Sequence, residues 1–285
     1  MNLKETAKEI RQILEQRRQE LNLTFVEDTH TYTMNDLNGN PKNEWYSVSK
    51  VIKKFYEQFD SDGIAERKAQ GDPVEKARLL KEWEDAGTYS TNMGSRTHYF
   101  LEKKSLDMFG LDKEVRQPLF ECDFIQVLKS DSMITAGTNF LNLMKERSGE
   151  LLDTEIVLGD PELGYVGQPD KMWLFMDKSG EELGVVISDY KTNKPKNFEV
   201  NRFTKPMYRP FEKHPNTSLG HYYLQLPFYV KLFLKMLKGS KYENIKFLGA
   251  IIVLLKDDGK FEEFRVPKDV IKTIMDMDMK KYLTT

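Results

Sequence analysis

Two aspartates and a lysine lie where a short hairpin would bring them together. Asp170 ends the stretch GYVGQPD and is followed by the apolar run KMWLFM. Asp189 and Lys191 lie in SDYKTNK, directly after the apolar run LGVVI. Antiparallel strands joined by a turn near Gly180 would place the two aspartates side by side at one sheet edge, because the start of one strand lies beside the end of the next.

Two carboxylates in this position repel each other unless a cation lies between them. A hard divalent ion with oxygen ligands suits such a pair. Lys191 is two residues beyond Asp189, so both side chains face the same side of a strand. A lysine there could hold an attacking water and stabilise charge on a phosphate. The alternative is an ordinary surface Asp–Lys pair, since the D-x-K tripeptide is common.

Two predicted helices add polar side chains that could face the same place. His98 lies in MGSRTHYFLE, with Glu102 one turn further along the same helix face. Gln225 and Tyr229 are four residues apart in QLPFY and could both donate hydrogen bonds from one face. Pro227, between them, could kink that helix. Neither pair is specific alone, because a lone histidine is more often a core or surface residue than a ligand.

The first half of the chain has mainly helical patterns. We expect a helix over 3–21, a strand and turn from residue 23, and a helix over 46–59 capped by Ser47 or Ser49. Residues 61–89 have a charged helical pattern that is interrupted at GDP. A helix from 90–92 to Gly110 and one or two helices within 115–147 follow.

In the second half of the chain, the helical spacing of apolar residues gives way to short apolar runs separated by turn residues. The runs LLDTEIVLGD, GYVGQPDKMWLFMD and LGVVISDYKT predict a three-stranded antiparallel meander. A proline-containing segment, 193–216, is followed by a helix (218–237), strands at 245–256 and 260–267, and a closing helix (268–283). This order indicates a mixed α/β layer. The chain shows no firm boundary, so we expect one domain, 1–285, in which 1–89 is a mostly helical N-terminal elaboration.

Four motifs in this order resemble those of the PD-(D/E)XK nuclease superfamily. They are the helical GSRTH, then GQPD, DYKT and QLPFY, and the resemblance covers roughly residues 90–235. The chain is most similar to the RecB-like and lambda-exonuclease-like branch, with its phage-encoded and mitochondrial genome maintenance exonucleases. The resemblance implies a restriction-endonuclease-like core over 90–285: a mixed central sheet with an antiparallel meander, flanked by helices.

The resemblance also implies a role for each matching residue. His98, Asp170, Asp189 and the backbone carbonyl of Tyr190 match the ligands of one or two Mg²⁺ or Mn²⁺ ions. Lys191 matches the catalytic lysine, which acts with the two aspartates. Further matches are Gln225 and Tyr229, near the nucleic-acid strand, and Glu155, an accessory acid, with Glu102 a weaker candidate. Some family members hold an iron–sulfur cluster on four cysteines, which the single cysteine here excludes.

The segment 193–216 carries local positive charge that the whole chain, at a net charge of −2, lacks. Its basic residues are interleaved with aromatic ones, a combination suited to single-stranded nucleic acid. The alternative is a surface loop whose aromatics reach into the core. The basic residues are Lys194, Lys196, Arg202, Lys205, Arg209 and Lys213, and the aromatic ones are Phe198, Phe203, Tyr208 and Phe211.

The resemblance therefore implies a metal-dependent deoxyribonuclease, an exonuclease acting on single-stranded or end-containing DNA in replication, recombination or repair. A catalytically silent binding module, a small-molecule phosphohydrolase and a structure-specific endonuclease are the alternatives. The charged N-terminus and the lack of a long apolar run predict a cytoplasmic protein with no membrane partner. The resemblance to phage-encoded nucleases adds a phage protein in its host cytoplasm as one such case. Replication or recombination proteins are candidate partners, and the oligomeric state stays open.

Overall fold

A five-stranded mixed sheet forms the centre of the fold. The computed structural model describes residues 2–26, 29, 31–177 and 179–283. The strand order is β11-β10-β9-β8-β5; β9 and β10 are parallel, and the other neighbours are antiparallel. The strands are β5 (Glu150–Thr154), β8 (Lys171–Met176), β9 (Leu183–Lys191), β10 (Lys246–Leu255) and β11 (Phe261–Arg265). The mixed sheet flanked by helices confirms the coarser part of the predicted fold.

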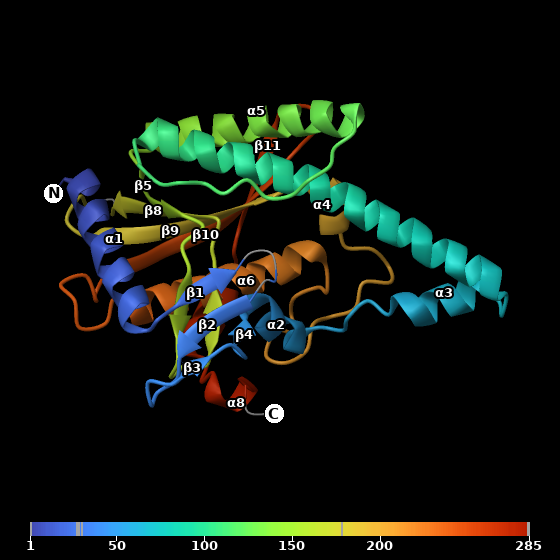
Figure 1. Ribbon diagram of the computed structural model, residues 1–285, viewed down its shortest axis with the longest axis horizontal. Helices are drawn as coiled ribbons and strands as arrows, with labels where there is room; N and C mark the ends of the chain where they lie inside the picture. Colours follow the sequence, from blue (N-terminus) through green and yellow to red (C-terminus); the bar gives the residue numbers. More distant parts are fainter. Residues whose placement is uncertain (1, 27–28, 30, 178, 284–285) are drawn as a thin grey trace.

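Helices cover both faces of this sheet (Figure 1). Alternate residues of each strand face opposite sides. Leu151 and Trp173 pack into one buried cluster with the first pair of helices, whereas Leu152 and Met172 pack into another with the second group. The first pair is α4 (Pro73–Phe109) and α5 (Phe124–Glu146), and the second group is α1 (Leu3–Glu20), α6 (Ser218–Met236) and α7 (Lys268–Asp276).

The predicted meander is interrupted by a second hairpin. β8 pairs with both β5 and β9, but β6 (Leu158–Asp160) and β7 (Tyr165–Gly167) leave the central sheet and join β4 (Tyr46–Ser47) in the order β4-β7-β6. The first two apolar runs therefore each form two strands. Glu155 has a φ of 45°, a left-handed conformation that ends β5. The β8–β9 turn contains Gly180 at a φ of 73°, as expected from the sequence.

The N-terminal region is helical with a small sheet. α1 matches its prediction, and its residues Ala7, Ile10 and Leu14 lie in the main core. The stretch from residue 23 forms two strands, not one, and residues 27–28 and 30 lie outside the described residues. The elements are β1 (Thr24–Val26), β2 (Thr31–Asn35), β3 (Pro41–Lys42), α2 (Val48–Ile52), the 3₁₀ helix η2 (Lys53–Phe55) and α3 (Ser61–Ala69).

The predicted helix over 46–59 is too long. Ser47 caps α2, as one of the two expected caps, but helical structure ends at Phe55. Phe59, at the end of the predicted helix, is 71% exposed. The segment from Tyr56 instead runs out toward α3.

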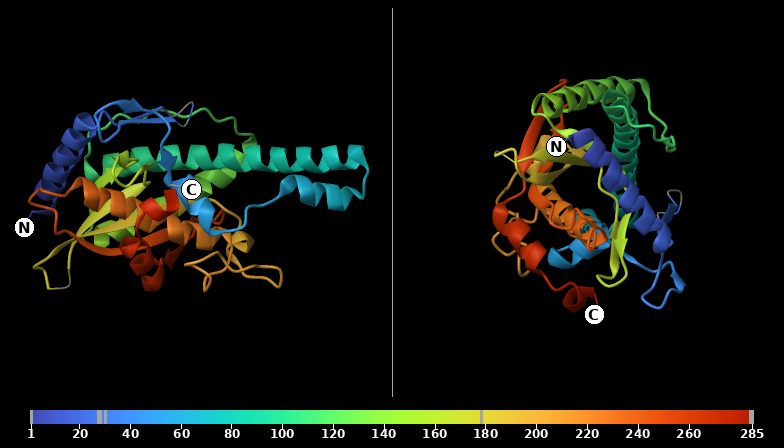
Figure 2. Two further views of the ribbon diagram at one scale, coloured as in Figure 1. Left: turned by 90° about the horizontal axis from the view of Figure 1, so that it is seen from below. Right: turned by 90° about the vertical axis from the view of Figure 1, so that its left-hand side faces the viewer.

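The prediction that a helix begins near residue 90 is wrong. α4 begins at Pro73, capped by Asp72, and continues to Gly110, whose φ of 66° ends it. The boundary at 89/90 therefore lies inside one continuous helix. The first half of α4 and α3 together project from the body as an arm (Figure 2).

The remaining elements follow the predictions closely. α5 begins only at Phe124, because Asp123 and Gln126 form a capping box, and 111–123 has no regular structure. Segment 193–216 is irregular apart from η3 (Pro195–Phe198). The closing helix is divided into α7 and α8 (Lys280–Leu283). Among the described residues, no helix is both long and apolar enough to span a membrane.

Candidate metal centre and active site

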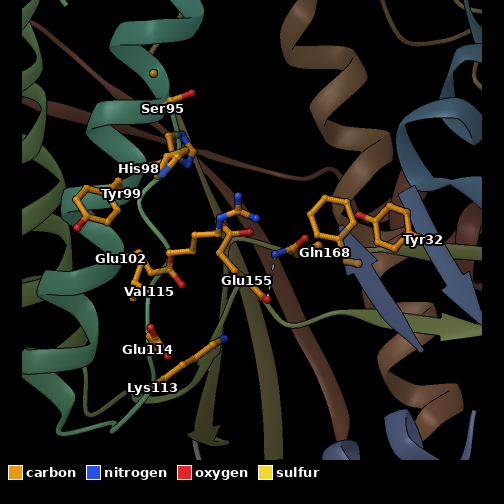
Figure 3. Close-up of a pocket in the computed structure, with 14 residues that line it drawn as sticks. Tyr32, Ser95, His98, Tyr99, Glu102, Lys113, Glu114, Val115, Glu155 and Gln168 are labelled. Carbon is orange, nitrogen blue, oxygen red and sulfur yellow. Dashed lines mark hydrogen bonds between the residues drawn. The ribbon is translucent and has the colours of Figure 1, made fainter. Parts of the chain in front are cut away.

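Three side chains from separate elements converge at one end of the central sheet. His98 lies on α4, Glu155 directly follows β5, and Asp170 directly precedes β8. One possible ligand atom from each lies within 4.8 Å of the other two. His98 Nδ1 is 3.3 Å from Asp170 Oδ2, and the Glu155 backbone N–H donates to the Asp170 carbonyl at 3.0 Å. Figure 3 shows His98 on α4 across from Glu155.

α4 is held close to the sheet where it carries His98. Leu101 on this helix is fully buried, and the Thr97 hydroxyl lies 2.8 Å from that of Ser130 on α5. Gly94 allows a close approach to the end of β9, because a Cβ there would lie 3.2 Å from Thr192 Oγ1. His98 is therefore presented to the carboxylates by a packed helix and not by a loop.

Asp170 and Asp189 lie side by side, as the hairpin pattern predicted. Lys171 pairs with Ser188 across β8 and β9, so the next pair along the strands is Asp170 with Asp189. The Tyr190 N–H donates to Asp170 Oδ2 at 3.0 Å. Asp189 is almost completely buried, with its side chain 5% exposed, and it contacts Lys191 Nζ. The side chain of Tyr190 packs on the opposite face, against Phe140.

Burial and mutual repulsion dominate the electrostatics of this cluster. Burial, followed by the charge of Asp170, raises the pKa of Asp189 to about 7. Burial also raises the pKa of Glu155, and neighbouring carboxylates raise it further. Burial opposes ionisation of Asp170, but His98 and the nearby lysines outweigh it and hold that pKa well below its ordinary value. The carboxyl groups of Glu155 and Asp189 therefore resist ionisation unless a cation lies beside them, and carboxylate and imidazole groups are ligand types that bind divalent metal ions.

We expect the affinity for Mn²⁺ to rise roughly tenfold between pH 6 and pH 8, because the ion displaces a proton from Asp189. Metal-free stability should show the opposite trend. The folded state binds more protons than the unfolded state between the ordinary pKa of 3.8 and about 7, so stability should fall as pH rises through that window. Calorimetric Mn²⁺ titrations and urea unfolding in EDTA at several pH values measure both; a pH-independent affinity would contradict the prediction.

Lys191 is fixed on the α6 side of the cluster. Burial lowers its pKa, but Asp189 and Asp170 outweigh this and raise it, so the side chain stays protonated. Its Nζ lies 4.4 Å from the ring centroid of Tyr222, whose hydroxyl donates to Asn193 Oδ1 at 3.0 Å. The motif analysis missed Tyr222, although it lies on α6 three residues before Gln225.

The two residues of the QLPFY motif contact each other. Gln225 Nε2 donates to the Tyr229 hydroxyl at 2.7 Å. Tyr229 is only 5% exposed. Its ring lies against Gly167, where a Cβ would be 2.5 Å from a ring carbon. Tyr229 thus supports the GQPD loop that presents Asp170, and Gln225 is the more accessible of the two.

A second lysine belongs to the cluster, and the motif analysis did not predict it. Lys171 is 3% exposed, with its Nζ 4.4 Å from the Tyr190 ring centroid. Burial lowers its pKa, while Asp170, Glu155, Glu102 and Asp189 act in the opposite direction. Its signal in the sequence is a lysine immediately after Asp170, at the first position of an otherwise apolar strand. Glu102, a weak candidate, also reaches this area, and its Oε1 accepts from Thr154 Oγ1 at 2.9 Å.

A hollow of about 670 Å³ opens beside His98 and Glu155 (Figure 3). Its size is typical of a small-molecule or nucleotide site. Gln168 forms part of the wall and donates to the Glu155 carbonyl at 3.1 Å. The remaining lining is mixed. It includes aromatic and basic side chains (Phe25, Tyr32, Tyr99, Lys113 and Arg116) and the acids Glu102 and Glu114.

The basic segment 193–216 continues from β9 on the Lys191 side. Its six basic residues, including Lys194, Lys196 and Arg202, are exposed. Its four aromatic residues do not all face solvent, because Phe198 and Phe211 are buried in the core, whereas Phe203 is 75% and Tyr208 51% exposed. Two of the four predicted stacking residues are therefore core residues. Arg202 lies over the Phe203 ring, 4.6 Å from its centroid.

Comparison of the chain with protein-family models and with curated proteins finds no match to either. The resemblance described above therefore depends on the four motifs and on the geometry of their residues.

Proposed function

We propose that this chain is a divalent-metal-dependent deoxyribonuclease with a restriction-endonuclease-like core. The observation that carries the proposal is the convergence of His98, Glu155, Asp170 and the Asp189–Lys191 pair at one end of the sheet. These residues are up to 93 positions apart in sequence, and helix, strand and loop packing all contribute to the arrangement. A buried carboxylate cluster beside a protonated lysine suits hydrolysis of a phosphodiester.

Each side chain has a defined task in this proposal. His98, Asp170, Asp189 and Glu155 would hold Mg²⁺ or Mn²⁺, together with the Tyr190 carbonyl. The bound ion would supply Lewis acidity and lower the pKa of a water ligand. Lys191 orients the attacking water and offsets charge that develops on the phosphoryl oxygens. Tyr222 and Asp189 fix the position of its ammonium group.

The exposed basic segment favours a nucleic-acid substrate over a small phosphate ester. Lys194 and Lys196 follow Lys191 within five residues, so a strand bound in the site would pass beside them. The exposed Phe203, with Arg202 over its ring, offers a surface for base stacking. We infer single-stranded or end-containing DNA as the substrate and exonucleolytic cleavage as the mode, in replication, recombination or repair.

Replacing Lys194, Lys196 and Arg202 together by alanine should weaken single-stranded DNA binding at least tenfold. It should also lower the slope of log Kd against log salt by about 2, because about three phosphate contacts are lost. Fluorescence anisotropy with a labelled oligonucleotide in Ca²⁺ measures both quantities. The matched control replaces the exposed Lys8, Lys241 and Lys246, on α1 and around the start of β10, and should leave the slope unchanged. Equal effects of the two triple variants would contradict a DNA path along Lys194, Lys196 and Arg202.

One gel separates the proposed function from its alternatives. End-labelled linear single strands, linear duplex and circular single strands are incubated with Mg²⁺, Mn²⁺ or EDTA. We expect the linear strands to be shortened from an end only with metal, while the circle survives. Cleavage of the circle would indicate an endonuclease. No cleavage despite measurable metal binding would indicate a catalytically silent module, and hydrolysis confined to mononucleotide esters would indicate a small-molecule phosphohydrolase.

A further inference from the structure

The hollow beside the candidate metal centre is built from separate parts of the chain. α4 forms one wall with Tyr99, and the β1–β2 hairpin forms another with Phe25 and Tyr32. Residues of the irregular stretch 111–123 form a third wall. The hollow is therefore bounded by packed elements on several sides and does not depend on one loop.

The third wall is held near both of its ends. Lys113 Nζ donates to Asp153 Oδ1 at 3.0 Å and also contacts the Thr154 carbonyl. At the other end, Asn92 Nδ2 donates to the Glu121 carbonyl at 2.8 Å. These contacts fix the irregular stretch to β5 and to α4, so the hollow is already formed without a ligand.

Aromatic side chains lie on two sides of the hollow. Phe25 and Tyr32 are cross-strand partners whose ring centroids are 4.5 Å apart. Figure 3 shows Tyr32 and Tyr99 on opposite sides, with Glu155 and Gln168 between them. Aromatic rings stack on nucleobases, and carboxamides such as that of Gln168 form hydrogen bonds with base edges. The lining therefore suits a nucleobase.

The charged groups of the lining have both signs. Glu102 and Glu114 line the hollow, and so do Lys113 and Arg116. This is not the uniformly basic surface that would favour a second phosphate group. The uncharged base and sugar are therefore the parts of a nucleotide that suit the hollow, and its volume of about 670 Å³ is in the range of sites that hold one small ligand.

The hollow and the basic segment lie on different sides of the candidate metal centre. Lys191 lies on the α6 side and leads into segment 193–216, whereas His98 and Glu155 border the hollow on the side of α4 and the β1–β2 hairpin. A strand that follows the basic segment and places a phosphate at the carboxylates would therefore put its next nucleoside into the hollow.

We propose that this hollow binds the terminal nucleoside of a DNA strand, so that each cleavage removes one nucleoside unit from the end. Water supplies a hydroxyl to the scissile phosphorus and a proton to the sugar oxygen whose P–O bond breaks. The inference rests on the proposed function. It goes further by assigning a binding site to the group beyond the scissile phosphate, with Tyr32 and Tyr99 as the side chains that stack on its base.

The binding test uses full-length protein in Ca²⁺ and single strands with 2-aminopurine at the 5′ end, at the 3′ end or in the middle. Stacking on an aromatic ring quenches this fluorescent base. On binding, we expect one of the two terminal probes to be quenched more than the central probe, on the order of twofold or more. Tyr99→Leu and Tyr32→Leu should each remove most of this difference, whereas Tyr99→Phe keeps the ring and should retain it.

Tyr242→Leu is the matched control, because Tyr242 is also partly buried but its hydroxyl contacts Glu9 on α1. It should leave the quenching of every probe unchanged. Circular dichroism establishes that each variant is folded. Chromatography of the wild-type reaction in Mn²⁺ supplies a second readout, and we expect products that contain one nucleoside each.

Three results would overturn the inference: equal quenching of terminal and central probes, wild-type quenching in both folded leucine variants, or products that are mainly dinucleotides and longer. Metal-dependent shortening of the strand in the same preparation would leave the proposed function intact. Absence of both DNA binding and cleavage would overturn the proposed function as well. If the leucine variants do not fold, the wild-type probes and products still decide.

Discussion

Replacing Lys191 by methionine is expected to lower the rate of metal-dependent DNA cleavage by about 10²–10³-fold. Methionine has a similar length and can occupy the same space beside Tyr222, but it carries no charge to stabilise the transition state. The ammonium group contacts the buried carboxylate of Asp189, so its loss also removes a direct counter-charge from that acid. Metal binding should therefore persist or strengthen while cleavage is lost.

The measurement is single-turnover cleavage of a labelled DNA strand at saturating Mn²⁺, with Mn²⁺ affinity determined on the same preparation. Circular dichroism in Mn²⁺ establishes that the variant is folded. Lys246→Met is the control, because Lys246 begins β10 at the opposite end of the sheet and pairs with Glu182 on the surface. It should change the rate less than twofold. A Lys191→Met protein that cleaves at the wild-type rate would exclude this lysine from the chemistry.

Replacing Asp170 by asparagine should weaken Mn²⁺ binding on the order of 100-fold or more, because one carboxylate charge next to the ion is lost. The rate of DNA cleavage at a low Mn²⁺ concentration should fall by at least the same factor. The metal-free variant should also be less stable than the wild type. Asparagine can still accept from the Tyr190 N–H, but it lacks the negative charge that His98 and the nearby lysines stabilise. The metal-free variant should therefore unfold below the wild-type temperature.

Thermal unfolding with EDTA and with Mn²⁺ checks both parts of this prediction. The wild type should gain stability on adding Mn²⁺, since the ion binds only the folded state, and Asp170→Asn should gain little. Asp177→Asn is a suitable control, because Asp177 caps the β8–β9 turn at the other end of the same hairpin. An equal Mn²⁺-induced shift in wild type and Asp170→Asn would show that Asp170 does not hold the ion.

Counting residues outward from the turn near Gly180 placed Asp170 and Asp189 correctly. A short turn between two antiparallel strands leaves little choice in which residues pair. The arrangement of side chains at the end of β9 followed in the same way, since alternation alone puts Asp189 and Lys191 on one face and Tyr190 on the other. Local rules of this kind hold wherever the strand is regular.

Other parts of the site depend on distant packing and could not be predicted in this way. Glu155 approaches His98 and Asp170 because a left-handed residue ends β5 at that point, and no turn residue marks the position in the sequence. Lys171 is buried because α4 covers the start of β8, and this follows only from the path of a helix that runs through residues 73–109. Because this helix is continuous, the boundary expected near residue 90 lies inside it.

The burial of the aromatic residues in segment 193–216 could not be predicted from the sequence either. Composition made Phe198 and Phe211 equivalent to Phe203 and Tyr208, but an irregular segment has no period that would show which side chains face the core. The structure divides them equally between core and surface. Stacking on DNA is thus a testable property of Phe203 and Tyr208 alone within this set.

We infer that an ion bound by the carboxylate cluster supports the cleavage of DNA. The test titrates Mn²⁺ into metal-free protein with a 5′-labelled linear strand and measures both the cleavage rate and the bound Mn²⁺. We predict no cleavage in EDTA and a rate that rises with occupancy of the site, with the same midpoint. Cleavage that persists in EDTA, or a fully occupied site that cleaves no DNA, would contradict the claim.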